Sequence, residues 1–230
     1  MRRVRANDGF DSRDGFLFLG NQLALDFVNT RPLLNGEPAE LLPDFSALLR
    51  WFVAAGLLGS REAENLQKQW GTSVRTQRTV EAMRELREKL RKKIVSWEAG
   101  GAAHPDTIAQ INRLMAAHPM LTRLQAHGNE TRWELYFEPQ EPEDLFAPLA
   151  HSAAMLFARA DRTRVRKCGN CVLHFLDTSK KGTRRWCSMQ LCGNRLKVAA
   201  YAKRRREDEG QCPAHPYSTR NARRADPGPG

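Results

Sequence analysis

The sequence predicts an α+β protein in which a mostly helical N-terminal domain with a small β-hairpin or sheet precedes a compact cysteine-rich module. Three observations lead to this prediction. Several segments repeat apolar residues at helical spacing, two segments around Gly128 have the residues of a β-hairpin, and all five cysteines lie after residue 167. Apolar residues form 41% of the chain, enough to bury a core, which excludes general disorder.

Composition divides the 230 residues into four segments. Residues 1–15 are polar and charged, and we expect them to form a flexible leader. Residues 16–161 contain the helical pattern, and residues 162–206 contain four of the five cysteines. Residues 207–230 are rich in Pro, Gly, Ser and Arg and are expected to form a disordered tail. We therefore expect two folded domains, over residues 16–161 and 162–206.

The N-terminal domain opens with the most apolar stretch of the chain. Residues 16–19 suit a short strand. Leu23 and Phe27 lie at helical spacing, so a short helix is expected after Asn21. Residues 31–43 contain three prolines and a glycine, and we expect them to form a loop.

Longer helices follow this loop. Asp44 is a good N-cap, and Gly56 ends the segment that Asp44 begins. The clearest pattern is Val74–Glu98, whose apolar stripe includes Leu86 or Arg87 while Lys, Arg and Glu cover the other face. We expect helices over residues 44–55, 60–70, 74–98, 105–117 and 144–160.

A β-hairpin is expected before the last of these helices. Residues 121–126 and 132–138 have strand character and flank Gly128-Asn129, a pair suited to a turn. One antiparallel pair of strands would then form the small sheet of the helical domain.

The cysteines cluster instead of spreading along the chain. A closed structural zinc site holds four ligands in a tetrahedron, whereas a catalytic zinc keeps one position open. Four unrelated buried thiols and disulfides are the alternatives, and clustering in a reducing compartment favours a metal over disulfides. The pattern C-x2-C-x15-C-x4-C predicts one structural zinc ion with four ligands: Cys168, Cys171, Cys187 and Cys192.

The spacing within the module predicts how it folds. Residues 172–176 and 184–186 are expected to form a hairpin with a turn at 177–182, and residues 196–206 contain good helix formers. A knuckle, a hairpin and a second cysteine pair at the start of a helix make a treble-clef-like zinc finger. His174 is a competing zinc ligand, although a position in the hairpin is the favoured interpretation.

The positive charge of the chain is concentrated in the same module. Residues 162–206 hold fourteen Lys or Arg and one acid, Asp177, giving +13, whereas the net charge of the whole chain is +11. Ion pairs inside the module cannot neutralise this excess, so nucleic-acid phosphates are the expected partner. The candidate contacts are Lys180, Lys181, Arg184, Arg185, Asn194, Arg195, Lys197, Lys203, Arg204 and Arg205.

Two of these candidates have side chains that can read bases. Asn194 suits adenine and Arg195 suits guanine in the major groove. The helix start around Gly193 could also bind a phosphate through its free amides. The competing interpretation is structural: both side chains would hydrogen-bond the knuckle backbone and hold the second cysteine pair in place.

Two strings of residues resemble known families. Cys192-Gly193-Asn194-Arg195, at the end of the four-cysteine pattern, resembles the CGNR zinc finger, which is named for these residues. Residues 20–30, GNQLALDFVNT, resemble the opening motif of the ABATE domain, which commonly precedes a CGNR finger in bacterial proteins. The resemblance implies a bacterial stress-induced transcription regulator whose finger binds DNA. It also implies the same four zinc ligands.

Asp26, Asn29 and Thr30 lie beside an apolar run within the second string. Buried polar groups need partners, and the pocket of a small-molecule ligand is one way of supplying them. The favoured alternative is that these residues cap a helix and fix the loop after it. Because a regulator often has a sensing domain, a small-molecule effector is an expected partner.

Enzymatic motifs are missing from the sequence. No glycine-rich phosphate loop, G-x-S-x-G or H-E-x-x-H string occurs, and the six histidines are scattered, so the chain is not expected to be an enzyme. No apolar run is long enough to span a membrane and no secretory signal is recognisable, so we expect a cytoplasmic protein without a membrane partner.

Three functions are compatible with these observations. The first is a zinc-dependent DNA-binding transcriptional regulator whose N-terminal domain senses an effector or forms a homodimer. Val74–Glu98 is a candidate dimer face, although its apolar stripe is more simply explained by the core of the domain itself. The second is an RNA- or ribosome-associated zinc protein, and the third is a protein-docking zinc adaptor. The few aromatic residues of the module favour duplex DNA over single-stranded RNA. Steep loss of binding with salt separates the first two functions from the third.

Overall fold

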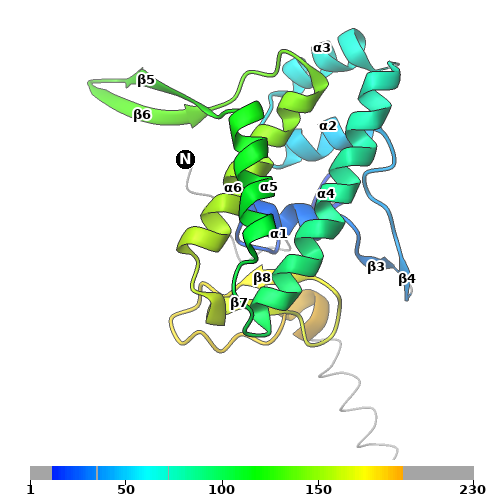
Figure 1. Ribbon diagram of the computed structural model, residues 1–230, viewed down its shortest axis with the longest axis vertical. Helices are drawn as coiled ribbons and strands as arrows, with labels where there is room; N and C mark the ends of the chain where they lie inside the picture. Colours follow the sequence, from blue (N-terminus) through cyan, green and yellow to red (C-terminus); the bar gives the residue numbers. More distant parts are fainter. Residues whose placement is uncertain (1–11, 35, 72, 194–230) are drawn as a thin grey trace, which may run out of the picture.

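The computed structural model describes residues 12–34, 36–71 and 73–193. This part of the chain forms six α-helices, and its strands form four two-stranded antiparallel sheets (Figure 1). The helices are α1 (Leu23–Val28), α2 (Phe45–Ala54), α3 (Ser60–Trp70), α4 (Val74–Glu98), α5 (Pro105–Ala117) and α6 (Phe146–Arg159). The strands are β1 (Ser12–Arg13), β2 (Phe16–Leu17), β3 (Leu33–Leu34), β4 (Glu37–Pro38), β5 (Leu121–His127), β6 (Glu130–Tyr136), β7 (Val165–Lys167) and β8 (His174–Leu176).

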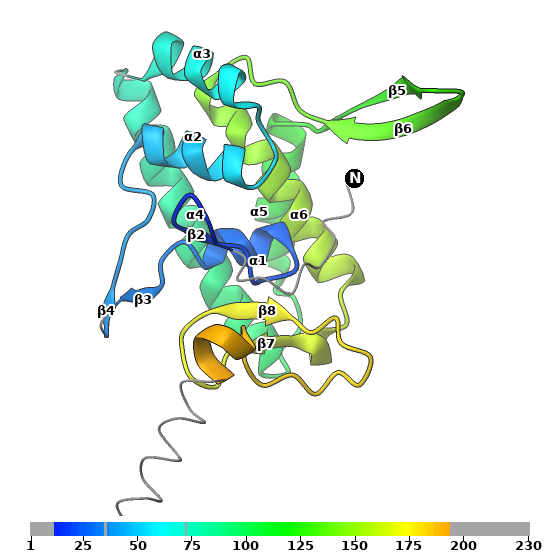
Figure 2. The same ribbon diagram turned by 180° about the vertical axis from the view of Figure 1, so that it is seen from behind.

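The helices α4, α5 and α6 run along the long axis of the molecule. The helices α2 and α3 lie at one end, the cysteine module lies at the other, and α1 lies between them (Figures 1 and 2). The main core is aromatic where α1 meets α2: Trp51 is fully buried and contacts the rings of Phe27 and Phe52 at centroid distances of 5.7 and 5.4 Å. This core positions α1, which carries the string that resembles the ABATE opening motif.

Most expected helices form where local signals specify them. Asp44 caps α2 by accepting a hydrogen bond from the N–H of Ala47 at 2.8 Å. Ser73 caps α4 in the same way, accepting from the N–H of Thr76 at 3.1 Å. The bounds of α3, α4 and α5 are those predicted. The last expected helix, over 144–160, is in two parts, since a 3-10 turn (η1, Pro142–Leu145) precedes α6.

The first strand of the chain is part of a hairpin. The strand β2 pairs with β1 across a turn in which Asp14 and Gly15 have φ angles of 49° and 80°. The sequence placed β1 in a flexible leader and predicted a lone strand over 16–19. The structure differs because Phe16 is buried in the main core, and the residues before it fold back onto the strand that it anchors.

The apolar stripe of α4 is buried in the protein's own core. Its members are Val80, Met83, Leu86, Leu90, Ile94 and Trp97. The stripe therefore packs in the core of its own domain and is not free to form a dimer face. Although α4 has 25 residues, neither it nor any other helix described is long and apolar enough to cross a membrane.

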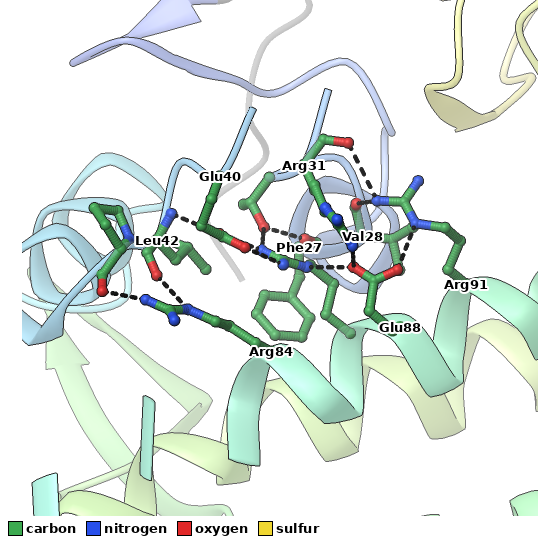
Figure 3. Close-up of polar contacts among 11 residues, drawn as sticks. Phe27, Val28, Arg31, Glu40, Leu42, Arg84, Glu88 and Arg91 are labelled. Carbon is green, nitrogen blue, oxygen red and sulfur yellow. Dashed lines mark hydrogen bonds and ion pairs between the residues drawn. The ribbon is translucent and has the colours of Figure 1, made fainter. Parts of the chain in front are cut away.

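Arginines on the buried face of α4 hold the loop after α1 (Figure 3). The guanidinium of Arg87 is 1% exposed and donates two hydrogen bonds to the carboxylate of Glu40, one of them at 2.7 Å. It also donates to the hydroxyl of Thr30 at 3.0 Å. The arginines on either side donate to backbone carbonyls of the same segment, Arg84 to Leu42 and Arg91 to Val28. Leu86 and Arg87 are thus both buried, and Arg87 is a buried cation because the loop supplies its counter-ion.

The β5–β6 hairpin extends away from the helical body (Figures 1 and 2). The two strands pair along their whole length, from Leu121 opposite Tyr136 to His127 opposite Glu130. The hairpin was expected from the sequence, with bounds that differ by one or two residues. It leaves the body at the end remote from the cysteine module.

Candidate metal centre

The first cysteine pair lies in a knuckle between two paired strands. β7 and β8 are antiparallel, with Lys167 opposite His174. The N–H of Cys168 donates to the carbonyl of Leu173 at 2.8 Å, which closes the knuckle that also contains Cys171. The strands therefore hold the two sulfur-bearing residues in a tight turn.

The sequence assigned the wrong partner to β8. Residues 184–186 were expected to be the second strand of the finger hairpin, but they form no strand and approach the knuckle through one bond, from the N–H of Gly169 to the carbonyl of Arg185 at 3.0 Å. The strand that pairs with β8 precedes the knuckle instead. Because the knuckle is short, the segments before and after it lie side by side, so β7 is closer to β8 along the chain than residues 184–186 are.

The second cysteine pair is brought in by a loop and a short π-helical turn. Cys187 ends the loop, and Cys192 lies within the turn η3 (Met189–Gly193). The N–H of Cys192 donates to the carbonyl of Ser188 at 3.0 Å. The helix expected over 196–206 lies outside the described residues.

The four sulfur atoms gather at one point. All lie within 4.8 Å of one another, and the Sγ atom of Cys187 is 3.6 Å from those of Cys171 and Cys192. A tetrahedral zinc with bonds of about 2.3 Å separates its sulfurs by about 3.8 Å, whereas a disulfide requires about 2.05 Å. The thiols are free. Cys168, Cys171, Cys187 and Cys192 therefore form a closed site for one structural zinc ion, as the spacing predicts.

The electrostatics of the cluster also call for a cation. Hydrogen bonds from the thiols of Cys171 and Cys187 hold the pKa of Cys168 well below its ordinary range. The thiolate of Cys168 in turn raises the pKa of Cys171 to about 12, and it also raises the pKa of Cys187. One thiolate thus forms readily while its neighbours resist ionisation, so a bound cation is needed to deprotonate the full set.

Close contacts with neighbouring side chains explain two glycines of the cysteine motifs. A Cβ atom on Gly169 would lie 2.8 Å from the indole ring of Trp186, and one on Gly193 would lie 2.7 Å from the sulfur of Met189 and 3.4 Å from the same indole. The indole therefore leaves no room for a side chain at Gly169, and a side chain at Gly193 would displace Met189.

Arg184, a candidate phosphate contact, has an internal role. Its guanidinium lies 4.5 Å from the ring centroid of the buried Phe175 and donates to the carbonyls of Trp186, at 2.7 Å, and Cys187. The backbone N–H of Arg184 donates to the carboxylate of Asp177 at 2.8 Å. Burial lowers the pKa of Arg184, although nearby negative groups oppose this. Arg184 therefore holds the loop that leads to the second cysteine pair.

Two more arginines hold the loop over residues 177–183. Arg164 donates to the carbonyls of Asp177 and Ser179 at 3.2 and 2.8 Å, and Arg166 donates to the carbonyl of Gly182 at 2.9 Å. Carbonyl oxygens accept these bonds without neutralising the guanidinium charges, although the Nε atom of Arg164 also lies 3.8 Å from the carboxylate of Asp161. The loop is thus fixed in place while its surroundings stay positive.

The remaining candidate contacts divide into an exposed group and an undescribed group. Lys180, Lys181 and Arg185 are exposed, with Lys180 and Lys181 on the fixed loop and Arg185 beside Trp186. The others lie outside the described residues: Asn194, Arg195, Lys197, Lys203, Arg204 and Arg205.

The segment that precedes and forms α1 supplies a docking edge for the finger. Asn29 donates from its side-chain amide to the carbonyl of His174 at 2.8 Å, and its side-chain oxygen accepts from the N–H of His174, also at 2.8 Å. The N–H of Leu176 donates to the carbonyl of Gly20 at 2.8 Å, and Asn21 donates to the carbonyl of Leu176 at 2.9 Å. β8 thus has β7 on one edge and this segment on the other.

The apolar cores of the two parts also interpenetrate. Leu17 and Leu19 pack with the buried cysteines of the finger, and Val165 of β7 is buried in the main core. The N–H of Lys167 donates to the carboxylate of Glu98, at the end of α4, at 2.7 Å. The finger and the helical domain therefore share one packed interface, which sequence reasoning did not detect because its residues are far apart in the chain.

The three residues considered for a ligand pocket have partners within the chain. Asp26 accepts from the N–H of Gly20 at 2.7 Å, Asn29 binds the finger, and Thr30 donates to the carbonyl of Phe27 at 2.7 Å. These contacts support the alternative that the residues fix the helix end and its loop. A groove of about 550 Å³ lies elsewhere, between α2 and α3.

His174 lies in β8 and is not one of the clustered ligands. Its side chain is 2% exposed, and Nε2 is 4.0 Å from the carboxylate of Glu98. Burial, together with the positive charges of Arg91 and Lys167, lowers the pKa of His174 to about 4. The ring is therefore neutral at pH 7 and belongs to the interface between the finger and the helical domain.

Comparison with known families agrees with this architecture. The family named ABATE, described as "Putative stress-induced transcription regulator", matches residues 21–160, and the CGNR zinc finger matches residues 164–205. Both families are regulator or zinc-finger types and not enzymes. No curated protein matches the chain. With more than half of its length matched by one family, the chain belongs to the ABATE family and carries a CGNR zinc finger.

Proposed function

We propose that this zinc-binding regulator binds duplex DNA through its finger and has no catalytic activity. The observation that carries the proposal is the charge of residues 162–206, where fourteen cations face one acid. That acid, Asp177, is buried and accepts from the N–H groups of Ser179 and Arg184 at 2.9 and 2.8 Å. It therefore organises the loop and leaves most of the positive charge uncompensated.

The fixed loop supports phosphate binding. Lys180 and Lys181 are exposed on a segment that is already held by Arg164 and Arg166. Two cations on an ordered loop lose little conformational freedom on binding, and each phosphate that they neutralise releases counterions. The loop can thus hold a duplex backbone in register without reading its sequence.

The aromatic residues weigh against the RNA alternative. Phe175 is fully buried and covered by Arg184, and Trp186 packs against Gly169 of the first knuckle. Single-stranded RNA readers need aromatic faces on which bases can stack. Among the described residues of the finger, Phe175 is closed to stacking and Trp186 is half-buried beside Arg185, so these two rings favour duplex DNA as the partner.

The test is a titration of mixed-sequence duplex DNA and single-stranded RNA with the full chain, at two salt concentrations. Each titration is made with zinc bound and after zinc removal by a chelator. We expect zinc-dependent binding that favours the duplex and weakens steeply with salt. The double variant Lys180→Ala/Lys181→Ala should reduce the slope of log K against log salt by about 2.

A matched control removes two exposed charges at the other end of the molecule. Arg61→Ala/Lys68→Ala changes α3 and should leave the salt slope unchanged. Equal or tighter binding of RNA would place the RNA-associated function first. Binding to neither nucleic acid would contradict both, and would leave the protein-docking adaptor.

A further inference from the structure

The β5–β6 hairpin is an arm without a packing partner among the described residues of its own chain. All seven residues of β5 and the first four of β6 are exposed. No residue of either strand belongs to the hydrophobic clusters of the described residues. An isolated two-stranded hairpin is only marginally stable in water, so an arm of this length is expected to be covered by another surface.

The register of the hairpin gives it two different faces. Side chains opposite one another in an antiparallel pair lie on the same face, and the faces alternate along the strand. One face carries the charges, with Arg123 paired to Glu134, and Arg132 to Glu130 at 3.0 Å. The other face, here called the neutral face, carries Thr122, Leu124, Ala126, Thr131, Trp133 and Leu135.

The centre of the neutral face is apolar and open to solvent. Leu124 lies directly opposite Trp133, and the two residues are 73% and 65% exposed. Tryptophan and leucine side chains of this kind contribute strongly when a partner covers them. This cross-strand pair is therefore the expected anchor of an interface.

We propose that the neutral face binds the neutral face of a second copy of this chain. A face without charged side chains meets its own copy across a two-fold axis with no like charges opposed and no charge left unpaired. The charges of the hairpin lie on its opposite face, where each arginine has a glutamate partner, so they remain in water in the dimer.

The chemistry of the arm does not suit other classes of partner. Nucleic acid requires unpaired cations, and both arginines of the hairpin are paired with carboxylates. A membrane surface requires a larger apolar face flanked by basic residues. A face of this composition, with a leucine and a tryptophan at its centre, has the character of a protein interface.

The size of the arm sets the strength of the contact. A seven-residue strand is about 24 Å long, so two such faces cover less than the roughly 1,200 Å² of a standard interface. The dimer should therefore depend on concentration, with a dissociation constant on the order of micromolar. The arm leaves the body at the end opposite the finger, so dimerisation leaves both fingers exposed (Figure 1).

The test is sedimentation equilibrium of the full zinc-loaded chain over about 1 to 300 µM, a range that brackets a weak interface. We expect a mass that rises from 26.1 kDa toward twice that value. Trp133→Thr and Leu124→Thr, made separately, keep strand-forming residues and should each weaken the dimer about tenfold or more. The matched control Arg123→Thr/Glu134→Thr removes one ion pair from the charged face and should keep the wild-type mass.

Zinc content and thermal unfolding show whether each variant is folded, and both should be unchanged because the arm lies outside the core. A wild-type chain that stays monomeric at every concentration would overturn the proposal. A dimer that survives both neutral-face variants would overturn it as well. The measurement needs no DNA, so its failure is distinct from failure of the proposed function.

Discussion

Asn29 and His174 form a closed pair of hydrogen bonds across 145 residues of sequence. The amide of Asn29 donates to the carbonyl of His174, and its oxygen accepts from the N–H of the same residue, both at 2.8 Å. The side chain of the residue that caps the C-terminal end of α1 thus satisfies the backbone of β8 as a neighbouring strand would. In this chain, one role of the ABATE opening motif is to hold the finger.

Replacing this amide should destabilise the protein. In Asn29→Ala, the N–H and carbonyl of His174 lose their partners in a site where both residues are nearly fully buried. Leaving a buried backbone group without a partner costs about 1–3 kcal/mol. Urea unfolding should report a loss in this range. A chelator should also extract zinc faster from the variant, because the finger has lost part of its docking edge.

A control of the same type is available on α5. Asn112 is exposed, so Asn112→Ala should change the free energy of unfolding by less than about 0.5 kcal/mol and leave zinc extraction unchanged. If Asn29→Ala behaved like this control, the docking role of Asn29 would be wrong.

Local features of the fold could be predicted from the sequence, whereas contacts between distant segments could not. The bounds of α4 and α5 were predicted to the residue, since periodicity, caps and glycines act within one helix. The predicted partner of β8 was wrong. The segments before and after β8 could each pair with it, and the sequence does not show which of them does. The contact between Asn29 and His174 has no signal in the local pattern at all.

A second prediction concerns the buried cation of α4. Arg87→Met removes the cation that pairs with Glu40 and leaves a partly buried carboxylate beside Thr30 without its counter-ion. Because Glu40 is 30% exposed and keeps its hydrogen bond from the N–H of Leu42, the cost should be about 1–3 kcal/mol, below that of breaking a fully buried pair. Arg78→Met, at an exposed position of the same helix, should cost less than about 0.5 kcal/mol. Chemical denaturation of the two variants measures both values, and similar costs would contradict the role of Arg87.

The same pair should contribute to the pH dependence of stability. Burial favours the protonated form of Glu40, but hydrogen bonds from Arg87 and the N–H of Leu42, with the charge of Arg87, outweigh it and lower the pKa of Glu40 below 4.5. Its contribution is therefore complete above that ordinary value and is lost as the pH falls through the lower folded-state pKa. The stability difference between wild type and Glu40→Gln should shrink on acidification. A constant difference would show that Glu40 is not the titrating group.

The metal ligands could be predicted from the sequence, but the residues that hold the surrounding loops in place could not. Thiolate chemistry and paired spacing identify the four cysteines, because each pair is local. Arg184 was predicted only as a phosphate contact, and nothing in the sequence indicated that its guanidinium also donates to the carbonyls of Trp186 and Cys187. A charged residue in a basic stretch looks the same in sequence whether it faces solvent or holds a loop.

The last prediction is that zinc binding depends on the buried ligands and is coupled to the folding of the finger. Cys187 is fully buried, and its sulfur lies 3.6 Å from two of the other three ligands. Cys187→Ser should reduce the zinc content from one ion per chain to well below one, because the remaining three thiolates cannot close the tetrahedron. Cys212→Ser changes the cysteine outside the motif and should keep one zinc.

Loss of the metal should affect the two parts of the protein differently. The free energy of metal binding stabilises the folded state of a small finger. The helices instead keep their own core of residues such as Trp51 and Ile94. Circular dichroism of Cys187→Ser should thus retain most of the helical signal, while limited proteolysis should cleave the finger first. Stoichiometric zinc in Cys187→Ser, or equal loss in both variants, would show that the four clustered sulfurs are not the metal ligands.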